Sequence, residues 1–275
     1  GNQTMMRALY TAASGMRAQQ TNVDNISNNI ANVNTTAFKS QKTEFKSLLY
    51  QTIQTRTTSA NGEEKPIGAQ VGLGTRVASN TTSYTQGALL EDESKSAFAI
   101  EGNGFFQVRG ADGTTYYTRN GNFNWSIGPT GTTLTNTDGY PVLDSNGNTI
   151  VLPNNVNSEK AVVTTDGQVG YYNNAGAYVS MNRTIGLSQF NNPAGLEKAG
   201  SNLLRATNAS GAALNEATNA NLTRSKIHQG YLEGSNVQVA DEMVNLIVAQ
   251  RAYQLNSKAI TTSDDMLEQA NNLKR

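Results

Sequence analysis

The last stretch of about forty residues constrains this chain most, because from Ser235 to Leu273 apolar residues recur with a helical period. One column repeats every seven residues, the spacing of a coiled-coil seam: Val239, Leu246, Tyr253, Ile260 and Leu267. A second set falls roughly on the opposite side of the same helix: Val244, Val248, Leu255, Ala259 and Met266. One partner helix can cover only one of these faces, and a helix of roughly 58 Å is too long for a small domain to wrap. The pattern therefore predicts contacts with other copies of the chain.

A second heptad pattern occupies the start of the sequence. Its two columns form one apolar stripe that only Gln19 interrupts: Met5, Ala12, Ile26 and Val33 in one column, and Leu9, Met16, Val23 and Ile30 in the other. Both seam positions are filled over about four heptads. An amphipathic helix on a globular core would also give such a stripe, but the length of this one favours pairing between the two terminal helices.

The other face of the N-terminal helix is rich in asparagine, which is a poor helix former because its amide competes for backbone hydrogen bonds. Asn25, Asn29 and Asn32 are among these residues. Fraying of the helix toward the turn at 32–36 is one explanation. We expect instead that the amides form hydrogen bonds between subunits, or a non-adhesive lining in an assembly.

Composition excludes several classes of partner and site. Only 15% of the residues are charged and the formal net charge is zero, so we expect no nucleic-acid partner and no polybasic membrane anchor. No apolar run approaches the roughly 18–20 residues that span a bilayer, so we expect no direct membrane insertion. The sequence contains no cysteine, which excludes disulfides and thiolate metal sites.

Between the terminal regions the pattern changes to short apolar or alternating runs separated by turn residues, which predicts a β-rich domain. Asp-Gly and Asn-Gly pairs, the residues that tight hairpin turns favour, separate the runs at positions 112, 120, 138, 146 and 166. A short helical piece is expected at 39–53, before a polar connector. The predicted fold is α+β, with the terminal helices pairing as an antiparallel coiled coil. The predicted ranges are an N-terminal helical assembly region at 1–50, an extended connector at 51–74, the β-rich domain at 75–225 and a C-terminal helical assembly region at 226–275.

The sequence offers little for catalysis or metal binding. His228 is the only histidine, and no Gly-x-Ser-x-Gly motif is present to expose a serine nucleophile. The segment 144–148 resembles the start of a calcium loop, but Asn155 replaces the glutamate expected at the twelfth position, so we interpret it as a plain turn. We expect no catalytic residue, no cofactor and no metal.

Several blocks resemble the bacterial flagellar rod and hook proteins. They are Asn28–Lys39 near the start, Ala99–Val108 and Tyr117–Gly121 in the middle, and Gly230–Val237, Glu242-Met243 and Gln250–Asn256 near the end. The resemblance covers nearly the whole chain. One departure is Ala37, where the family usually has glycine, and this leaves open whether the backbone there adopts a positive φ.

The resemblance implies a structural subunit of the flagellar basal body, outside the cytoplasm after export. Such a subunit would pack its terminal helices into a helical tube that transmits torque across the periplasm. The length of the chain favours the distal rod, with a proximal rod paralogue or a hook-type protein as the nearest alternative. Implied partners are further copies of itself, other rod proteins, the hook protein, the rings around the rod and the flagellar export apparatus. A peptidoglycan-cleaving enzyme and a secreted adhesin are the competing classes.

These patterns assign assembly contacts to particular residues. The column of Leu246, Tyr253 and Ile260 is expected to meet the chain's own N-terminal seam, and Val248, Leu255 and Met266 to meet neighbouring subunits. The full predicted set is Leu9, Met16, Val23, Ile26, Asn29, Ile30, Asn32, Phe38, Asn236, Val239, Leu246, Val248, Gln250, Arg251, Tyr253, Leu255, Ile260, Met266 and Leu267.

Overall fold

The computed structural model describes residues 1–47, 51–52, 70–71, 75–200 and 202–273. Long helices stand at the two ends of the sequence, α1 (Asn2–Ala31) and α2 (Val239–Leu273), and strands fill the middle. The chain is therefore α+β, as predicted. Within the part that the structure describes, no helix is both long and apolar enough to cross a membrane.

Twenty strands and two short 3₁₀ helices lie between the long helices in the described residues. They are β1 (Gln41–Ser47), β2 (Gln51–Thr52), β3 (Gln70–Val71), β4 (Thr75–Thr82), β5 (Leu89–Glu91), β6 (Phe98–Glu101), β7 (Phe105–Arg109), β8 (Thr115–Thr118), β9 (Asn124–Gly128), β10 (Gly131–Thr135), β11 (Val151–Leu152), η1 (Ser158–Lys160), β12 (Ala161–Val163), β13 (Gln168–Tyr172), β14 (Tyr178–Thr184), β15 (Leu187–Gln189), η2 (Pro193–Gly195), β16 (Glu197–Lys198), β17 (Leu204–Arg205), β18 (Leu214–Asn215), β19 (Lys226–Gln229) and β20 (Tyr231–Glu233).

The chain forms two compact units. The helical unit comprises residues 1–31, 41–82 and 238–275, and the β unit comprises residues 32–40 and 83–237. The chain therefore passes between the units four times, at 31/32, 40/41, 82/83 and 237/238.

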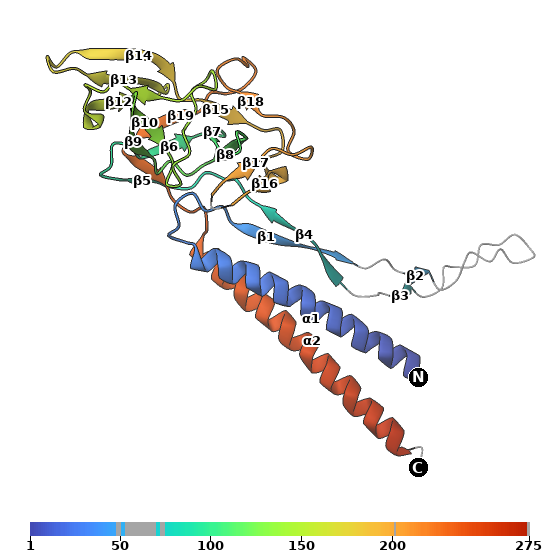
Figure 1. Ribbon diagram of the computed structural model, residues 1–275. Coiled ribbons are helices and arrows are strands. Elements are labelled where there is room, and N and C mark those ends of the chain that lie inside the picture. Colours follow the sequence, from blue (N-terminus) through green and yellow to red (C-terminus); the bar gives the residue numbers. More distant parts are fainter. Residues whose placement is uncertain (48–50, 53–69, 72–74, 201, 274–275) are drawn as a thin grey trace, which may run out of the picture. The chain divides into compact units, whose positions relative to one another are not determined.

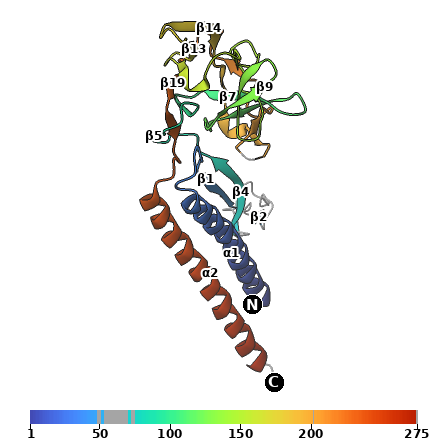
Figure 2. The same ribbon diagram turned by 60° about the vertical axis from the view of Figure 1, so that its left-hand side comes forward.

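In the helical unit, α1 and α2 lie side by side in both views, with the two chain termini at the same end of the pair (Figures 1 and 2). Strands β1 and β4 pair antiparallel from Gln41 opposite Thr82 to Ser47 opposite Thr75, and both contact α1. Helix α2 begins at Val239, four residues later than the predicted stretch. Helix α1 ends at Ala31, so Val33 of the predicted stripe lies beyond it.

The predicted helical piece at 39–53 is wrong, because β1 occupies Gln41–Ser47. Its apolar residues recur with a helical period, but its backbone pairs with β4, whose partner residues lie 28 to 41 positions later, from Ser47 with Thr75 to Gln41 with Thr82. A local pattern does not report such pairing, which outweighs intrinsic propensity. Most of the predicted connector at 51–74 lies outside the described residues.

The β unit contains a six-stranded antiparallel sheet of order β16-β17-β8-β7-β15-β18, with smaller antiparallel sheets around it. Successive side chains of β7 point to opposite faces of the sheet. Phe106 and Val108 therefore belong to the main core, with Phe98, Phe123 and Ile150, while Phe105 belongs to a second cluster.

The prediction of a β-rich middle region is confirmed, and its short apolar or alternating runs include β6, β7, β8, β11, β12 and β14. The glycines of four predicted turns have positive φ: Gly113, Gly139, Gly147 and Gly167. Gly121 does not share that backbone conformation and is required for another reason. A Cβ atom there would lie 1.7 Å from the carbonyl oxygen of Phe98, so only glycine fits between β6 and the residues that follow β8.

Candidate functional site: helix faces and a buried junction cluster

The heptad column of α2 forms the covered side of this helix. Leu246, Tyr253, Ile260 and Leu267 are half-buried, and Ala249, four residues before Tyr253, is only 1% exposed. Val239 belongs to the same predicted column but is exposed at the start of the helix. The seam of α2 therefore begins about one heptad later than the sequence pattern suggested.

The stripe of α1 is covered as well. Ile26 is buried, and Leu9, Met16, Val23 and Ile30 are half-buried. A close contact between the two helices involves a residue outside the predicted stripe. A Cβ atom at Gly15 would lie 2.8 Å from the side-chain amide nitrogen of Asn256, so a larger residue at position 15 would have to displace the Asn256 side chain.

The opposite face of α2 exposes large apolar side chains. Val248 is 62% and Leu255 69% exposed, and Val244, Ile247 and Met266 are also exposed. Gln250 and Arg251 lie among them and are exposed too. Scattered exposed apolar residues are normal on a protein surface, but several large ones on one face of a helix indicate an interaction surface.

Asparagines of α1 make hydrogen bonds within the chain, whereas we expected hydrogen bonds between subunits from the sequence. Asn25 donates to Thr43 Oγ1 at 2.6 Å and to Asn80 Oδ1 at 2.8 Å, on β1 and β4. Asn29 is 1% exposed. Its amide donates to the Gln41 carbonyl at 2.8 Å and to Glu242 at 3.3 Å, and it accepts from the Gln41 N–H at 3.0 Å. These amides therefore attach the β1–β4 pair and the start of α2 to α1.

Asn32 also bonds locally. Its side chain and its carbonyl both accept hydrogen bonds from Thr35, at 3.0 and 3.1 Å, in the turn that follows α1. This turn belongs to the β unit.

The β unit contains a buried carboxylate with two cationic partners. The Glu233 side chain, at the end of β20, is completely buried. Its Oε1 lies 3.0 Å from Lys39 Nζ, and its Oε2 lies 2.5 Å from Arg119 Nη2. Gln86 also donates to Oε2. A buried ion pair is costly unless every charge is hydrogen-bonded, and here the carboxylate oxygens are fully occupied.

Arg119 connects this cluster to the backbone around β6 and β7. Its Nη1 donates to the carbonyls of Gly102 at 2.7 Å and Gly104 at 2.5 Å, and its Nη2 to that of Ile100 at 3.2 Å. Lys39 donates to the Thr85 carbonyl at 2.8 Å. Burial lowers the pKa of the Lys39 ammonium below its ordinary value, and the nearby Glu233 carboxylate opposes that effect.

Backbone bonds join the same segments. The Ala37 N–H donates to the Glu233 carbonyl at 2.8 Å, and the Asn236 N–H donates to the Phe38 carbonyl at 3.2 Å. The Asn236 side chain accepts from the Ser40 N–H at 2.8 Å and donates to the Ser83 carbonyl at 2.8 Å. Phe38 itself is half-buried.

Ala37 has a φ of +58°, so the positive backbone angle left open by the sequence is present without glycine. The left-handed conformation costs a residue with a Cβ roughly 1–2 kcal/mol. Glycine avoids this strain, but it also increases the conformational entropy of the unfolded chain, which offsets part of the gain in stability. We expect Ala37→Gly to raise the free energy of unfolding of the β unit by about 0.5–1 kcal/mol. Urea denaturation followed by the fluorescence of Trp125, the single tryptophan, measures it.

Gly139→Ala is the matched control for this change. Gly139 also has a positive φ, and nothing lies within 4 Å of the position its Cβ would take. The substitution should therefore lower stability by a similar amount, through backbone strain alone. If Ala37→Gly also destabilises the β unit, the strain at Ala37 is not the dominant effect.

Phe38 and Asn236 were among the residues predicted from the sequence, but Lys39, Gln86, Arg119 and Glu233 were not. The sequence does contain a feature that singles out three of these four residues as candidates for a buried ion pair. Lys39, Arg119 and Glu233 lie in separate family-like blocks, in a chain with few charges. Charged residues inside otherwise apolar or neutral blocks are candidates for buried ion pairs, because they are seldom buried alone.

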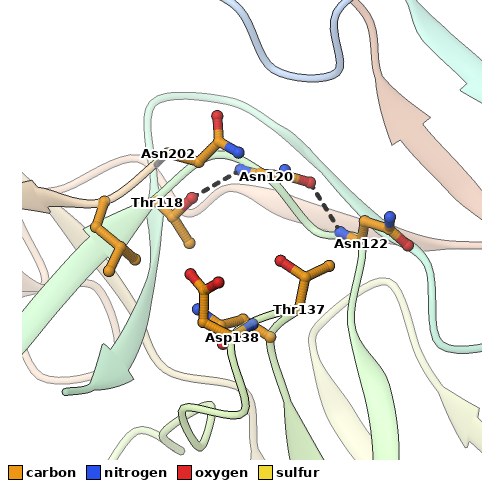
Figure 3. Close-up of a pocket in the computed structure, with 8 residues that line it drawn as sticks. Thr118, Asn120, Asn122, Thr137, Asp138 and Asn202 are labelled. Carbon is orange, nitrogen blue, oxygen red and sulfur yellow. Dashed lines mark hydrogen bonds between the residues drawn. The ribbon is translucent and has the colours of Figure 1, made fainter. Parts of the chain in front are cut away.

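Other polar features are local. A cavity of about 10 Å³ is lined by residues that include Thr118, Asn120 and Asn122 (Figure 3), and this volume suits about one water molecule.

The Asp144 carboxylate of the calcium-like segment accepts two backbone N–H bonds at 2.9 Å and pairs with Arg183 at 2.7 Å. His228 pairs with Glu101 at 2.7 Å, which lowers the pKa of that glutamate.

The sequence is similar to those of known proteins over nearly its whole length. Three family models match the chain: a flagella basal body rod protein model at residues 9–39, a flagellar hook protein FlgE/F/G D1 domain model at 99–171, and a flagellar basal body rod FlgEFG C-terminal model at 228–273. A flagellar basal-body rod protein FlgG from Borreliella burgdorferi is 43% identical over 98% of this chain and 100% of its own length. The FlgG protein of Bacillus subtilis is 40% identical over the same shares. The chain belongs to the flagellar basal-body rod protein family.

Membership in the rod family defines the general role. The chain is a structural subunit of the distal-rod type in the flagellar basal body, and it is not an enzyme. The first rod model covers most of α1 and ends at Lys39, and the last one covers Glu233 and α2. Glu233, Lys39, Gln86 and Arg119 together form what we call the junction cluster. The two terminal rod models cover the faces of α1 and α2 described above and two members of this cluster, Lys39 and Glu233.

Proposed function

We propose that this chain assembles into the distal rod as a helical tube that crosses the periplasm and transmits torque from the motor to the hook. The observation that carries the proposal is the exposed apolar face of α2, on a chain that matches rod proteins over nearly its full length. When one surface binds a different surface of the next copy and the rotation does not close, identical subunits form a helical array. The terminal regions 1–50 and 226–275 supply these surfaces.

We further propose that α1 and α2 pair within one chain as an antiparallel coiled coil. The heptad spacing of the covered α2 column and the close approach of Gly15 to Asn256 support it. The two chain termini at one end of the pair fit opposite helix directions (Figure 1). Val248, Leu255 and Met266, with Gln250 and Arg251, then remain free to contact neighbouring subunits.

One experiment tests both proposals. Because the chain has no cysteine, Gly15→Cys with Asn256→Cys places a single pair within reach of disulfide geometry. Oxidation at low concentration is expected to close this disulfide inside one chain, and the locked protein, when concentrated, is expected to form straight tubes visible by electron microscopy. Met6→Cys with Asn256→Cys is the control, because Met6 is 62% exposed on α1 and lies nine residues before Gly15, and it should not close within one chain.

The outcomes separate the two ideas. Disulfides that form only between chains would refute the intrachain pairing. A closed disulfide in a protein that never forms tubes, with the unlocked wild type also failing, would refute self-assembly. Curved tubes would favour a hook-type protein.

The proposed partners follow from this position. We expect contacts with further copies, other rod proteins, the hook protein, the rings around the rod and the flagellar export apparatus. The relatives support the rod and hook partners by their names: one, from Bacillus subtilis, is a flagellar hook-basal body complex protein FlhP that is 31% identical over 98% of this chain.

A further inference from the structure

The junction cluster lies where the chain leaves the β unit. Ser40, Ser83 and Asn236 stand at or next to three of the four points at which the chain passes to the helical unit. These three residues form a closed set of hydrogen bonds, each of 2.8 Å. The Ser83 N–H donates to the Ser40 carbonyl, the Ser40 N–H to Asn236 Oδ1, and the Asn236 amide to the Ser83 carbonyl.

Two residues of this set are close in sequence to buried charges of the junction cluster. Lys39 precedes Ser40, Glu233 lies three residues before Asn236, and Arg119 comes from the end of β8. A partly formed cluster would leave a buried charge without its partner, which is strongly unfavourable. The cluster should therefore form as a whole, and only when β6, β7 and β8 have already positioned Arg119 and its carbonyl acceptors.

We propose that the cluster around Glu233 is a latch that makes the pairing of α1 and α2 depend on folding of the β unit. About 200 residues separate the end of α1 from the start of α2, so their encounter in an unfolded chain carries a large loop-closure cost. The bonds from Ala37 to Glu233 and from Ser40 to Asn236 join segments only a few residues from each helix. Once the latch forms, the two helices are tethered at neighbouring points, and their local concentration rises.

This inference rests on the proposed role of the helix pair and concerns its control. A chain whose β unit is unfolded would leave α1 and α2 unpaired, so an incompletely folded subunit would not present the paired surface to the growing tube. Folding of the β unit would thus be a condition for assembly.

The test measures how fast the cysteine pair at positions 15 and 256 forms its disulfide in dilute, full-length protein. Two backgrounds are compared, Glu233→Gln and Asp144→Asn. The second is the matched control, because Asp144 is also a buried carboxylate paired with an arginine, Arg183 at 2.7 Å, in the β unit but away from the junction. Trp125 fluorescence identifies conditions in which the β unit is folded in each variant.

With the β unit folded, we expect Glu233→Gln to slow disulfide formation at least about tenfold and Asp144→Asn to leave it unchanged. Equal rates in both backgrounds would overturn the latch. If Glu233→Gln does not fold, Asn236→Ala replaces it, because it removes the hydrogen-bonded set without leaving a buried charge. A rate unchanged in Asn236→Ala would likewise refute the proposal. Tube formation is scored separately, so a failure of self-assembly is distinguishable from a failure of the latch.

Discussion

Replacing Arg119 with methionine is expected to lower the free energy of unfolding of the β unit by about 3–5 kcal/mol, because it breaks a buried charge pair by removing one partner. Methionine keeps much of the apolar stem but donates no hydrogen bond. Glu233 would lose two donors, and the carbonyls of Ile100, Gly102 and Gly104 would each lose one. Urea denaturation followed by Trp125 fluorescence gives the value.

Lys39→Met is the comparison that makes this prediction specific. It removes one contact to Glu233 and one to the Thr85 carbonyl, while Arg119 still neutralises the carboxylate. Burial already disfavours the charged form of Lys39, so part of the loss is recovered, and we expect only about 1–2 kcal/mol. Equal losses for the two variants, or a larger loss for Lys39→Met, would show that Arg119 is not the main partner.

The second large effect concerns assembly. The double substitution Val248→Glu with Leu255→Glu is expected to raise the concentration needed for tube formation more than about 100-fold, since each apolar side chain contributes roughly 1.5–3 kcal/mol when buried. Both side chains are mostly exposed in the single chain, so its folding should not change. Sedimentation of polymer and circular dichroism measure the two properties.

A second double variant controls for added charge. Asn245 and Asn271 are exposed on α2 but lie off its apolar face, and Asn245→Asp with Asn271→Asp adds the same two negative charges. We expect this protein to polymerise near the wild-type concentration. If both double variants block assembly equally, charge repulsion rather than the apolar face explains the effect.

How far the sequence predicts this structure depends on the range of the interactions involved. The two helices follow from their heptad columns, and strands such as β6 and β7 follow from apolar runs bounded by turn residues. These signals arise within a few neighbouring residues. Strand β1 was missed because β4, which pairs with it, begins 28 residues after β1 ends.

The same reasoning applies to the candidate site. The apolar columns identified the covered and exposed faces of α2, because helical geometry alone assigns residues to faces. The hydrogen-bond partners of Asn25 and Asn29 could not be predicted, since Thr43 and Gln41 lie in β1, a segment for which the local pattern predicted a helix. The cluster of Lys39, Arg119 and Glu233 joins three distant parts of the sequence, and nothing in their spacing indicates that they meet.

The close approach of Gly15 to Asn256 has a consequence for alignment. Columns that repeat every seven residues allow two helices to slide by one heptad and still bury apolar side chains. Such a slide would place Asn256 opposite Ala8 or Asn22, and both carry the Cβ atom that at position 15 would lie 2.8 Å from the Asn256 side chain. The absence of a Cβ atom at Gly15 would therefore favour one alignment among several of similar apolar content. In the proposed tube, an alignment error in one subunit would pass to the next, so this preference would help to keep the tube straight.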